Sequence, residues 1–193
     1  MSKTTIIVVV VILLFGAYGC STYNGLVGKD ETVNSAWAKV QTQYQRRADL
    51  IPNLVNTVKG AADFEKSTLS AVMEARSKAT SINLTADQLT PENIQKFQAA
   101  QDQLSGTLSR LLAVSENYPN LKANQNFLDL QAQLEGTENR ISIARNDFND
   151  VVKEYNQSVR TFPAALFAGM FGFQQKGYFE ASQSSQTAPT VKF

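Results

Sequence analysis

The apolar positions of the chain form one unbroken run at the start and then recur in a regular rhythm. Every residue from Ile6 to Phe15 is apolar, and no charged residue lies between Lys3 and Lys29. The uncharged stretch from Thr4 to about Tyr23 reaches about 30 Å as a helix, which is the thickness of the hydrocarbon core of a bilayer. The run therefore predicts one membrane-anchoring helix, with an apolar surface that includes Ile6, Val10, Leu13, Leu14 and Phe15.

Two other interpretations of this amino-terminal segment remain open. Lys3, the apolar run and the small residues Ala17 and Gly19 also resemble a secretory signal with cleavage before Cys20. Cleavage there would leave Cys20 as the first residue, where bacterial lipoproteins carry their lipid, and simple secretion is the other alternative. The bulky Tyr18 favours a retained helix. A retained helix and a lipidated Cys20 both attach the domain to a bacterial membrane, and the sparse flanking charges do not decide its side.

The longest periodic pattern of apolar positions lies late in the chain. Apolar and aromatic side chains recur three and four residues apart from Phe127 to Phe162, which is the spacing of one buried helix face. Pro163 ends the row because a proline ring does not continue a helix. The pattern predicts a helix from near Asn124 to Phe162, about 57 Å long.

A second row with the same spacing runs from Ile94 to Tyr118. The sequence Thr90-Pro91-Glu92 opens it with a capping hydroxyl, a proline at the first helical position and an acid at the positive end of the helix dipole. Pro119 ends it. Because the connection to the next helix is short, the two helices are predicted to be antiparallel neighbours.

Residues 31–80 carry a third helical pattern with two interruptions. Pro52 predicts a kink or a break near Asp49 because it lacks an N–H, and Gly60 weakens the helix locally. The three patterns predict an all-α fold, an elongated antiparallel bundle of three to four long helices preceded by one membrane-anchoring helix. We divide the chain into an anchor at 1–28, a helical bundle domain at 29–162, and a Gly- and Phe-rich segment with a polar tail at 163–193.

Composition argues against several classes of function. The net charge is +1, from 18 basic and 17 acidic side chains, so no excess of charge favours nucleic acid. The chain has no histidine, which removes Ser-His-Asp triads, Cys-His pairs and histidine metal sites. A glycine-rich phosphate loop is also missing from the sequence. We therefore predict no catalytic residue, no cofactor, no metal site and no enzymatic activity.

Arg47 falls within an apolar row, seven positions after Val40 and seven before Leu54. A charge in such a position needs a partner, and Glu138 or Asn139 on the longest helix can supply one. We predict a structural polar network of Arg47, Glu138 and Asn139, with a ligand or partner site as the alternative.

Asparagines at 139, 146, 149 and 156 form two pairs seven residues apart. They are interpreted as positions that fix the register of the bundle or face solvent. A groove for a polar ligand is the alternative.

Aromatic residues are dense after Pro163. Exposed, they would form a docking patch for a membrane or a protein, and folded back they would close one end of the bundle. Because the three long rows already pack against one another, we treat the segment as a candidate partner surface formed by Phe167, Phe171, Phe173 and Phe179.

Several long blocks of the sequence resemble the LemA family. They are Tyr23 to Val27, RRADLIPNLVNTVKG at Arg46 to Gly60, ENYPNLKANQNF at Glu116 to Phe127, TENRISIARNDFNDVVKEYN at Thr137 to Asn156, and the stretch from Phe162 to Phe173. The resemblance implies an amino-terminal membrane helix followed by an all-helical bundle. It supplies no catalytic residue, and the usual topology of the family places the short amino terminus outside and the bundle in the cytoplasm. Cys20 departs from the family, which needs no lipid anchor there.

The resemblance and the residues together favour a non-catalytic, membrane-anchored scaffold or adaptor for other envelope proteins. Some members of the family are linked genetically to membrane metalloproteases, so a membrane protease system is one partner class that the resemblance implies. The alternative hypothesis is an envelope binding module for a small polar or lipidic ligand. Homo-oligomerisation through the long helices stays open.

Overall fold

The computed structural model describes residues 2–60 and 64–180, so the polar tail predicted at 181–193 lies outside the described residues. Within these ranges the chain is helical and contains no strand, which confirms the all-α prediction. The elements are α1 (Lys3–Lys59), α2 (Lys66–Ser81), the 3-10 helix η1 (Ala86–Gln88), α3 (Pro91–Ser115), α4 (Pro119–Lys122), α5 (Gln125–Arg160) and α6 (Ala164–Phe171).

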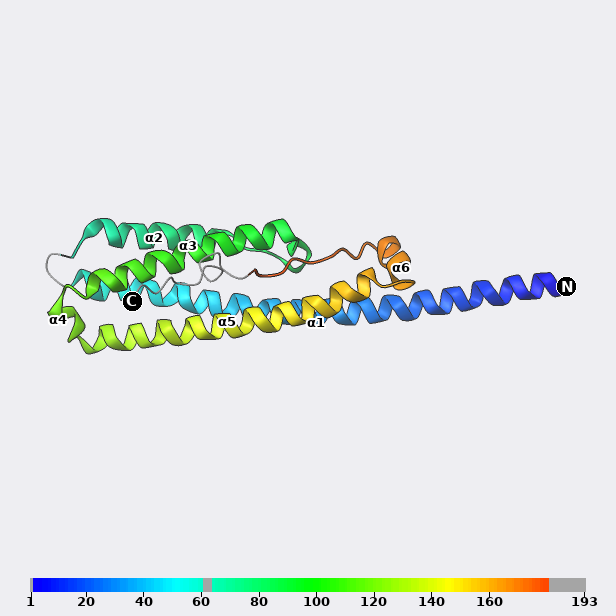
Figure 1. The fold of residues 1–193 in the computed structure, drawn as a ribbon, viewed down its shortest axis with the longest axis horizontal. Helices are drawn as coiled ribbons and strands as arrows, with labels where there is room; N and C mark the ends of the chain where they lie inside the picture. The colour runs from blue at the N-terminus through cyan, green and yellow to red at the C-terminus, as the bar shows by residue number, and fades with distance from the viewer. Residues whose placement is uncertain (1, 61–63, 181–193) are drawn as a thin grey trace, which may run out of the picture.

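Four long helical segments lie side by side in alternating directions and form an elongated bundle (Figure 1). They are the second half of α1, then α2, α3 and α5, with α1 packed along α5 and α2 packed along α3. The first part of α1 projects beyond the bundle, at the end opposite α4. The predicted antiparallel bundle with one preceding apolar helix is therefore confirmed.

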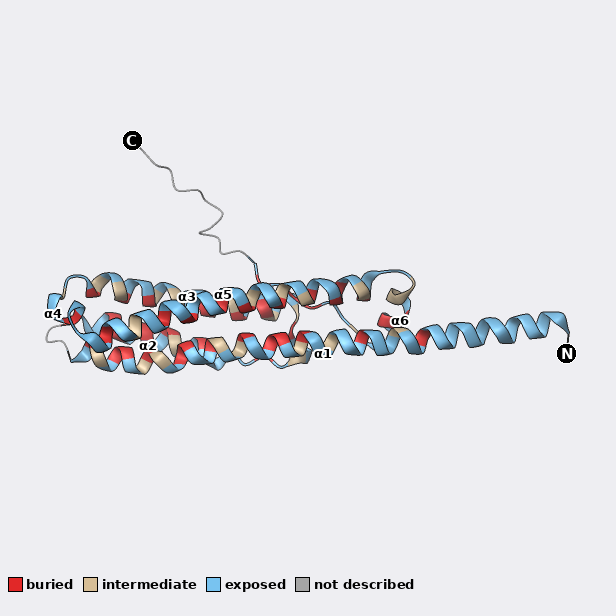
Figure 2. Cartoon of the chain, turned by 90° about the horizontal axis from the view of Figure 1, so that it is seen from below, coloured by how far each residue is buried: buried red, intermediate tan, exposed pale blue. Residues whose placement is uncertain are grey.

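The projecting part of α1 is the only segment of the described chain that is long and apolar enough to cross a membrane. Its apolar side chains from Ile6 to Phe15 are between 42% and 66% exposed, and Figure 2 shows that this part of the helix is almost wholly uncovered. Apolar side chains in such numbers are unfavourable in water. Their exposure fits a membrane anchor.

α1 passes through Pro52 as one helix, although the sequence predicted a kink or a break there. Pro52 has no N–H to donate to the carbonyl oxygen of Ala48, four residues earlier. The side chain of Arg76 on α2 takes that place, with Nε donating to the Ala48 oxygen over 2.7 Å. The prediction of a divided helix is wrong because a neighbouring helix supplies the missing donor.

The starts of α3 and α5 follow local capping chemistry. The Thr90 hydroxyl accepts a hydrogen bond from the backbone N–H of Asn93, and Pro91 occupies the first helical position. The Asn124 side chain accepts from the N–H of Phe127 in the same way. Between them, α4 buries Leu121 over the end of the bundle.

The buried face of α5 rotates along the helix. It follows the predicted row up to Phe148 and then moves to Val152, Tyr155 and Val159, while Phe162 is 78% exposed. A straight helix of 3.6 residues per turn drifts away from a strict seven-residue row, which is the cause of the shift. Phe162 lies beyond the end of α5 at Arg160 and is exposed outside the bundle.

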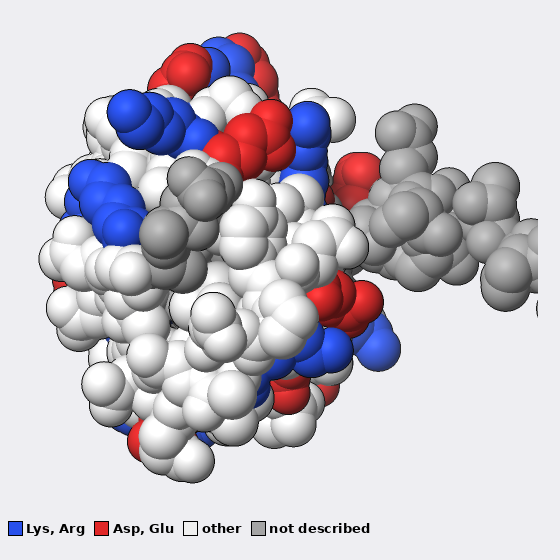
Figure 3. All heavy atoms as spheres, turned by 90° about the vertical axis from the view of Figure 1, so that its left-hand side faces the viewer, with Lys and Arg blue, Asp and Glu red and all other residues white. Residues whose placement is uncertain are grey.

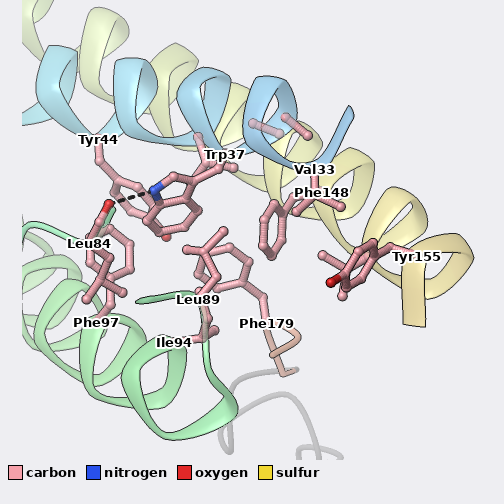
Figure 4. Packing of buried hydrophobic residues seen from close by; sticks show 14 of the residues in the cluster. Val33, Trp37, Tyr44, Leu84, Leu89, Ile94, Phe97, Phe148, Tyr155 and Phe179 are labelled. Carbon is pink, nitrogen blue, oxygen red and sulfur yellow. Dashed lines mark hydrogen bonds between the residues drawn. The ribbon is translucent and has the colours of Figure 1, made fainter. Parts of the chain in front are cut away.

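The core has an aliphatic half and an aromatic half. The half near α4 is built on side chains such as Ile51, Leu54, Leu104 and Leu111. The half nearer the anchor gathers aromatic rings from three helices and from residue 179, including Trp37, Phe97, Phe148 and Phe179 (Figure 4). The Trp37 indole N–H donates to the carbonyl oxygen of Leu84 over 3.0 Å, which fixes the α2–α3 connection on the bundle.

Candidate functional site

Arg47 lies inside the bundle, only 2% exposed, and its guanidinium connects α1 to two other helices. Nη1 donates to Ser105 Oγ over 2.6 Å and to Glu138 Oε2 over 2.8 Å, and Nη2 donates to Gln101 Oε1 over 2.6 Å. Gln101 in turn donates to the carbonyl oxygen of Ala79 at the end of α2. The hydrogen bonds therefore join all four long helices at one level of the bundle.

The structure pairs Arg47 with Glu138 and leaves Asn139 exposed, outside the hydrogen bonds of Arg47. The guanidinium also lies over the ring of Tyr44, 5.1 Å from its centre. Burial raises the pKa of Tyr44 to about 12. Among the described residues, Arg47 Nε has no hydrogen-bond partner, and the Glu138 side chain is 54% exposed. The two Nη atoms are bonded to side chains of α3 and α5, and these contacts favour a structural role for the cluster.

Residues 173–180, which we call the C-terminal strap, lie extended along the bundle and are held by two asparagines of α5. Asn156 accepts from the N–H of Lys176 and donates to its carbonyl oxygen, over 2.9 Å and 2.8 Å. Asn149 makes the same pair of bonds with Phe179, over 2.9 Å and 2.8 Å. Seven helical residues advance about 10.5 Å and three extended residues about 10 Å, so the two spacings match.

These contacts settle where the four asparagines lie. Asn149 and Asn156 hold the main chain of the strap, whereas Asn139 and Asn146 are exposed. The sequence interpretation missed this role because a backbone partner carries no side-chain signal. The seven-residue spacing between Asn149 and Asn156 was the only feature of the sequence that indicated a shared role.

Lys176 and Gly177 fix the strap to the rest of the bundle. The Lys176 ammonium lies 2.7 Å from Asp30 Oδ1 of α1, donates to the carbonyl oxygen of Ala86 over 3.2 Å, and sits 5.4 Å from the centre of the Tyr155 ring. The N–H of Gly177 donates to the carbonyl oxygen of Leu89 over 2.8 Å. A Cβ on Gly177 would stand 2.7 Å from a backbone carbon of Pro91, so the close approach requires glycine.

The four phenylalanines of the candidate partner surface differ in exposure, since two are buried and two are partly exposed. Phe179 is 5% exposed and packs among Trp37, Phe97 and Phe148, with the Arg145 guanidinium 4.8 Å from its ring centre. Phe179 therefore follows the alternative in which the aromatic residues fold back onto the bundle, and its ring is not available on the candidate partner surface. Figure 4 shows this ring entering the core from the strap.

Phe167 is also buried, at 4% exposed, against the apolar segment of α1. Its ring centre lies 4.8 Å from that of Phe15 and 5.6 Å from that of Tyr18. A Cβ on Gly19 would lie 2.7 Å from the Phe167 ring, so glycine permits the contact. Phe167 is therefore also folded back and is not available on the candidate partner surface.

Phe171 and Phe173 pack against Tyr23, at 5.0 Å and 5.8 Å between ring centres. Phe171 remains 44% exposed and Phe173 is half-buried. Cys20 is exposed on the continuous helix α1. These contacts form an aromatic cluster at the junction of α1 and α6.

Two open pockets lie near the same end of the molecule. One, of about 380 Å³, is lined by residues that include Asp30, Asp87, Tyr155 and Lys176. Its cation is already paired with Asp30 and a carbonyl oxygen, and within the described residues no group of three or more acidic or cysteine side chains could hold a metal. The second, of about 490 Å³, lies between α1 and α5 beside Lys29.

Comparison of the amino-acid sequence with known proteins identifies a family. The model of the LemA family matches residues 36–193. Magnetosome protein MamQ 2 of Paramagnetospirillum magneticum is 26% identical over 199 aligned residues, covering 94% of this chain and 73% of that protein. Protein LemA of Metamycoplasma hominis is 24% identical over 160 residues, covering 83% and 69%, and magnetosome protein MamQ of Magnetospirillum gryphiswaldense is 25% identical over 182 residues, covering 86% and 67%. The chain therefore belongs to the LemA family.

Proposed function

We propose that this protein is a non-catalytic scaffold that holds a stiff helical bundle against a bacterial membrane for an envelope protein partner. The observation that carries the proposal is the continuity of α1. One helix extends from the apolar segment at Ile6 to Phe15 into the core at Leu54 and Val58, without an intervening linker. A partner bound to the bundle would be held at a fixed position relative to the membrane.

The dimensions of α1 set the reach of the scaffold. With Tyr23 at the membrane interface, the residues from Tyr23 to Lys59 extend the bundle about 54 Å from the bilayer surface. The Arg47 network and the C-terminal strap lie along this length and tie the helices together. Charges of both signs lie around an uncharged area at the end opposite the anchor (Figure 3), a surface that suits a protein partner more than a polyanion.

Membrane anchoring is tested by fractionation and mass. A retained helix predicts that the protein stays with membranes after carbonate extraction, and that its intact mass includes residues before Cys20 with that thiol unmodified. Recovery of a diacylated Cys20 as the first residue would replace the retained helix by a lipid anchor. Recovery in the soluble fraction would contradict the scaffold proposal.

Partner binding is tested by photo-crosslinking in cells. A benzoylphenylalanine is placed singly at Met73, Leu128 or Ile143, which are 38%, 43% and 54% exposed on α2 and α5. A scaffold gives a discrete adduct with another protein from one face and not from the others. Membrane proteases are the first candidates to examine in such an adduct, because of the implied family link. Adducts with a second copy alone would instead assign the long helices to homo-oligomerisation.

The pocket of about 490 Å³ favours one alternative, a binding module for a lipidic ligand. It is lined by Leu26, Lys29 and Ser158 among others and lies just beyond the apolar span of α1, where the Lys29 ammonium donates to Ser158 Oγ over 2.6 Å. An amine above an apolar floor suits an anionic headgroup. Native mass spectrometry would support this alternative if a phospholipid stays bound to the wild-type protein and is lost from Lys29→Gln.

A further inference from the structure

α6 lies within the second longest uncharged segment of the described chain. No charged residue occurs between Arg160 and Lys176, and the segment presents several large apolar side chains to the outside of the fold. The exposed fractions are 78% for Phe162, 54% for Leu166, 74% for Met170 and 44% for Phe171. The opposite side of α6 is buried: Phe167 packs against the anchor segment of α1, and Ala168 packs in the bundle core.

The position of α6 along α1 places this apolar surface at the level of the anchor. Phe167 contacts Phe15 and Tyr18 and closes on Gly19, all of which belong to the uncharged stretch that ends near Tyr23. Phe15 is eight residues before Tyr23, which corresponds to about 12 Å along the helix axis. Figures 1 and 2 both show α6 beside α1, at the end of the bundle from which the anchor projects. A bilayer that surrounds the anchor up to Tyr23 would therefore also surround α6.

We infer that α6, together with Phe162, inserts into the membrane leaflet next to the bundle, so that lipid acyl chains cover its exposed apolar side chains. The inference rests on the proposed membrane anchoring by α1. Three observations favour lipid as the occupant: the segment has no charge, its exposed surface is continuous with that of the anchor, and aromatic contacts from Tyr23 to Phe171 and Phe173 close the junction at interface depth.

This insertion gives the bundle a second point of attachment to the membrane. A bundle on a single inserted helix can tilt relative to the bilayer, whereas a second apolar element in the same leaflet opposes any tilt that would expose that element to water. The strap then connects this second attachment to the core, through Lys176 and Phe179.

Depth-dependent fluorescence quenching tests the inference on the full-length protein. In a Cys20→Ser background, a single cysteine is introduced as Met170→Cys in α6, Val10→Cys in the anchor or Ile143→Cys in α5, and is labelled with the fluorophore NBD. Ile143 is the matched control, because it is an apolar side chain, 54% exposed, on the bundle. Each protein is reconstituted in vesicles of phosphatidylcholine and phosphatidylglycerol, and circular dichroism verifies its helix content.

We expect the label at position 170 to be quenched by doxyl-labelled lipid and shielded from aqueous iodide, as at position 10, with the reverse pattern at position 143. Iodide quenching at position 170, with lipid quenching retained at position 10, overturns the inference and leaves the anchor intact. Shielding of position 170 from both quenchers, with label-to-label energy transfer that rises with protein density, assigns the surface to a second copy and also overturns it. A label at position 10 that is quenched only by iodide contradicts the anchoring on which both proposals rest.

Discussion

The hydrogen bond from Arg76 to Ala48 makes a sharp prediction about how α1 remains whole. Ala48 is 3% exposed, and its carbonyl oxygen lacks the usual helical donor because residue 52 is proline. Arg76→Met keeps an unbranched apolar stem and removes the guanidinium, with its donors and its charge. A hydrogen bond from a charged group is worth about 1.5–3 kcal/mol, so we expect the free energy of unfolding to fall by about 2 kcal/mol.

The same substitution should cost much less when residue 52 can donate. In a Pro52→Ala background the new backbone N–H takes the Ala48 carbonyl, and we expect Arg76→Met to cost about 0.5 kcal/mol there. The coupling between the two positions is then about 1.5 kcal/mol. Arg140→Met, at an exposed position on α5, is the matched control and should change the free energy by less than about 0.5 kcal/mol.

The assay is urea unfolding of the four proteins of this cycle in nanodiscs, followed by tryptophan fluorescence. Trp37 is the only tryptophan and is 2% exposed, so its emission reports the packing of the bundle. An equal cost of Arg76→Met in both backgrounds would refute the reasoning. It would mean that Arg76 stabilises the bundle through packing, independently of the proline.

Three further predictions concern the buried groups. Arg47→Ala should lower the free energy of unfolding by about 3 kcal/mol, because it leaves the buried Gln101 side-chain oxygen unpaired and a cavity where the guanidinium packed. The exposed Arg46→Ala should change it little, and equal effects in thermal unfolding would contradict this. Burial raises the pKa of Tyr44 and of Tyr155 to about 12 from an ordinary value of 10.0, so the folded state favours the protonated phenol. The contribution of these two phenols to the free energy of unfolding should be fully present below pH 10 and should fall as the pH rises to about 12. A tyrosinate absorbance titration that ends near pH 10 would contradict this. Ending the chain after Pro163 removes Phe179 from the core, so we expect a lower melting temperature and a red shift of the Trp37 emission, whereas an unchanged bundle would show that the strap does not support the fold.

The sequence predicted the bundle because helical rows of apolar residues are a local property. The spacing between Phe127 and Phe148, and the capping residues Thr90 and Asn124, determine where α3 and α5 begin and which face they bury. The position of Arg47 within an apolar row was also sufficient to predict a buried cation with a partner on α5. In each case the signal is the position of a residue within the pattern of its own helix, although the partner of Arg47 lies on another helix.

The features that were missed depend on contacts between distant segments. Nothing near Pro52 in the sequence indicates that Arg76 will reach the carbonyl oxygen of Ala48 from another helix. The burial of Phe179 requires a gap between aromatic rows on different helices, and hydrophobic periodicity does not describe an extended strap. Asn149 and Asn156 bind main-chain atoms of the strap. Because every residue type carries these atoms, the sequence could not predict which residues the two asparagines bind.

The continuity of α1 from the apolar anchor into the bundle is tested most directly by a distance between two spin labels on that helix. The native Cys20 is exposed and is the only cysteine, and Thr42→Cys supplies a second exposed site within the bundle. A continuous helix separates these positions by about 33 Å, so double electron–electron resonance in nanodiscs should give one narrow distribution near that value. A broad or shorter distribution, or a Cys20 that cannot be labelled because it carries lipid, would contradict the account.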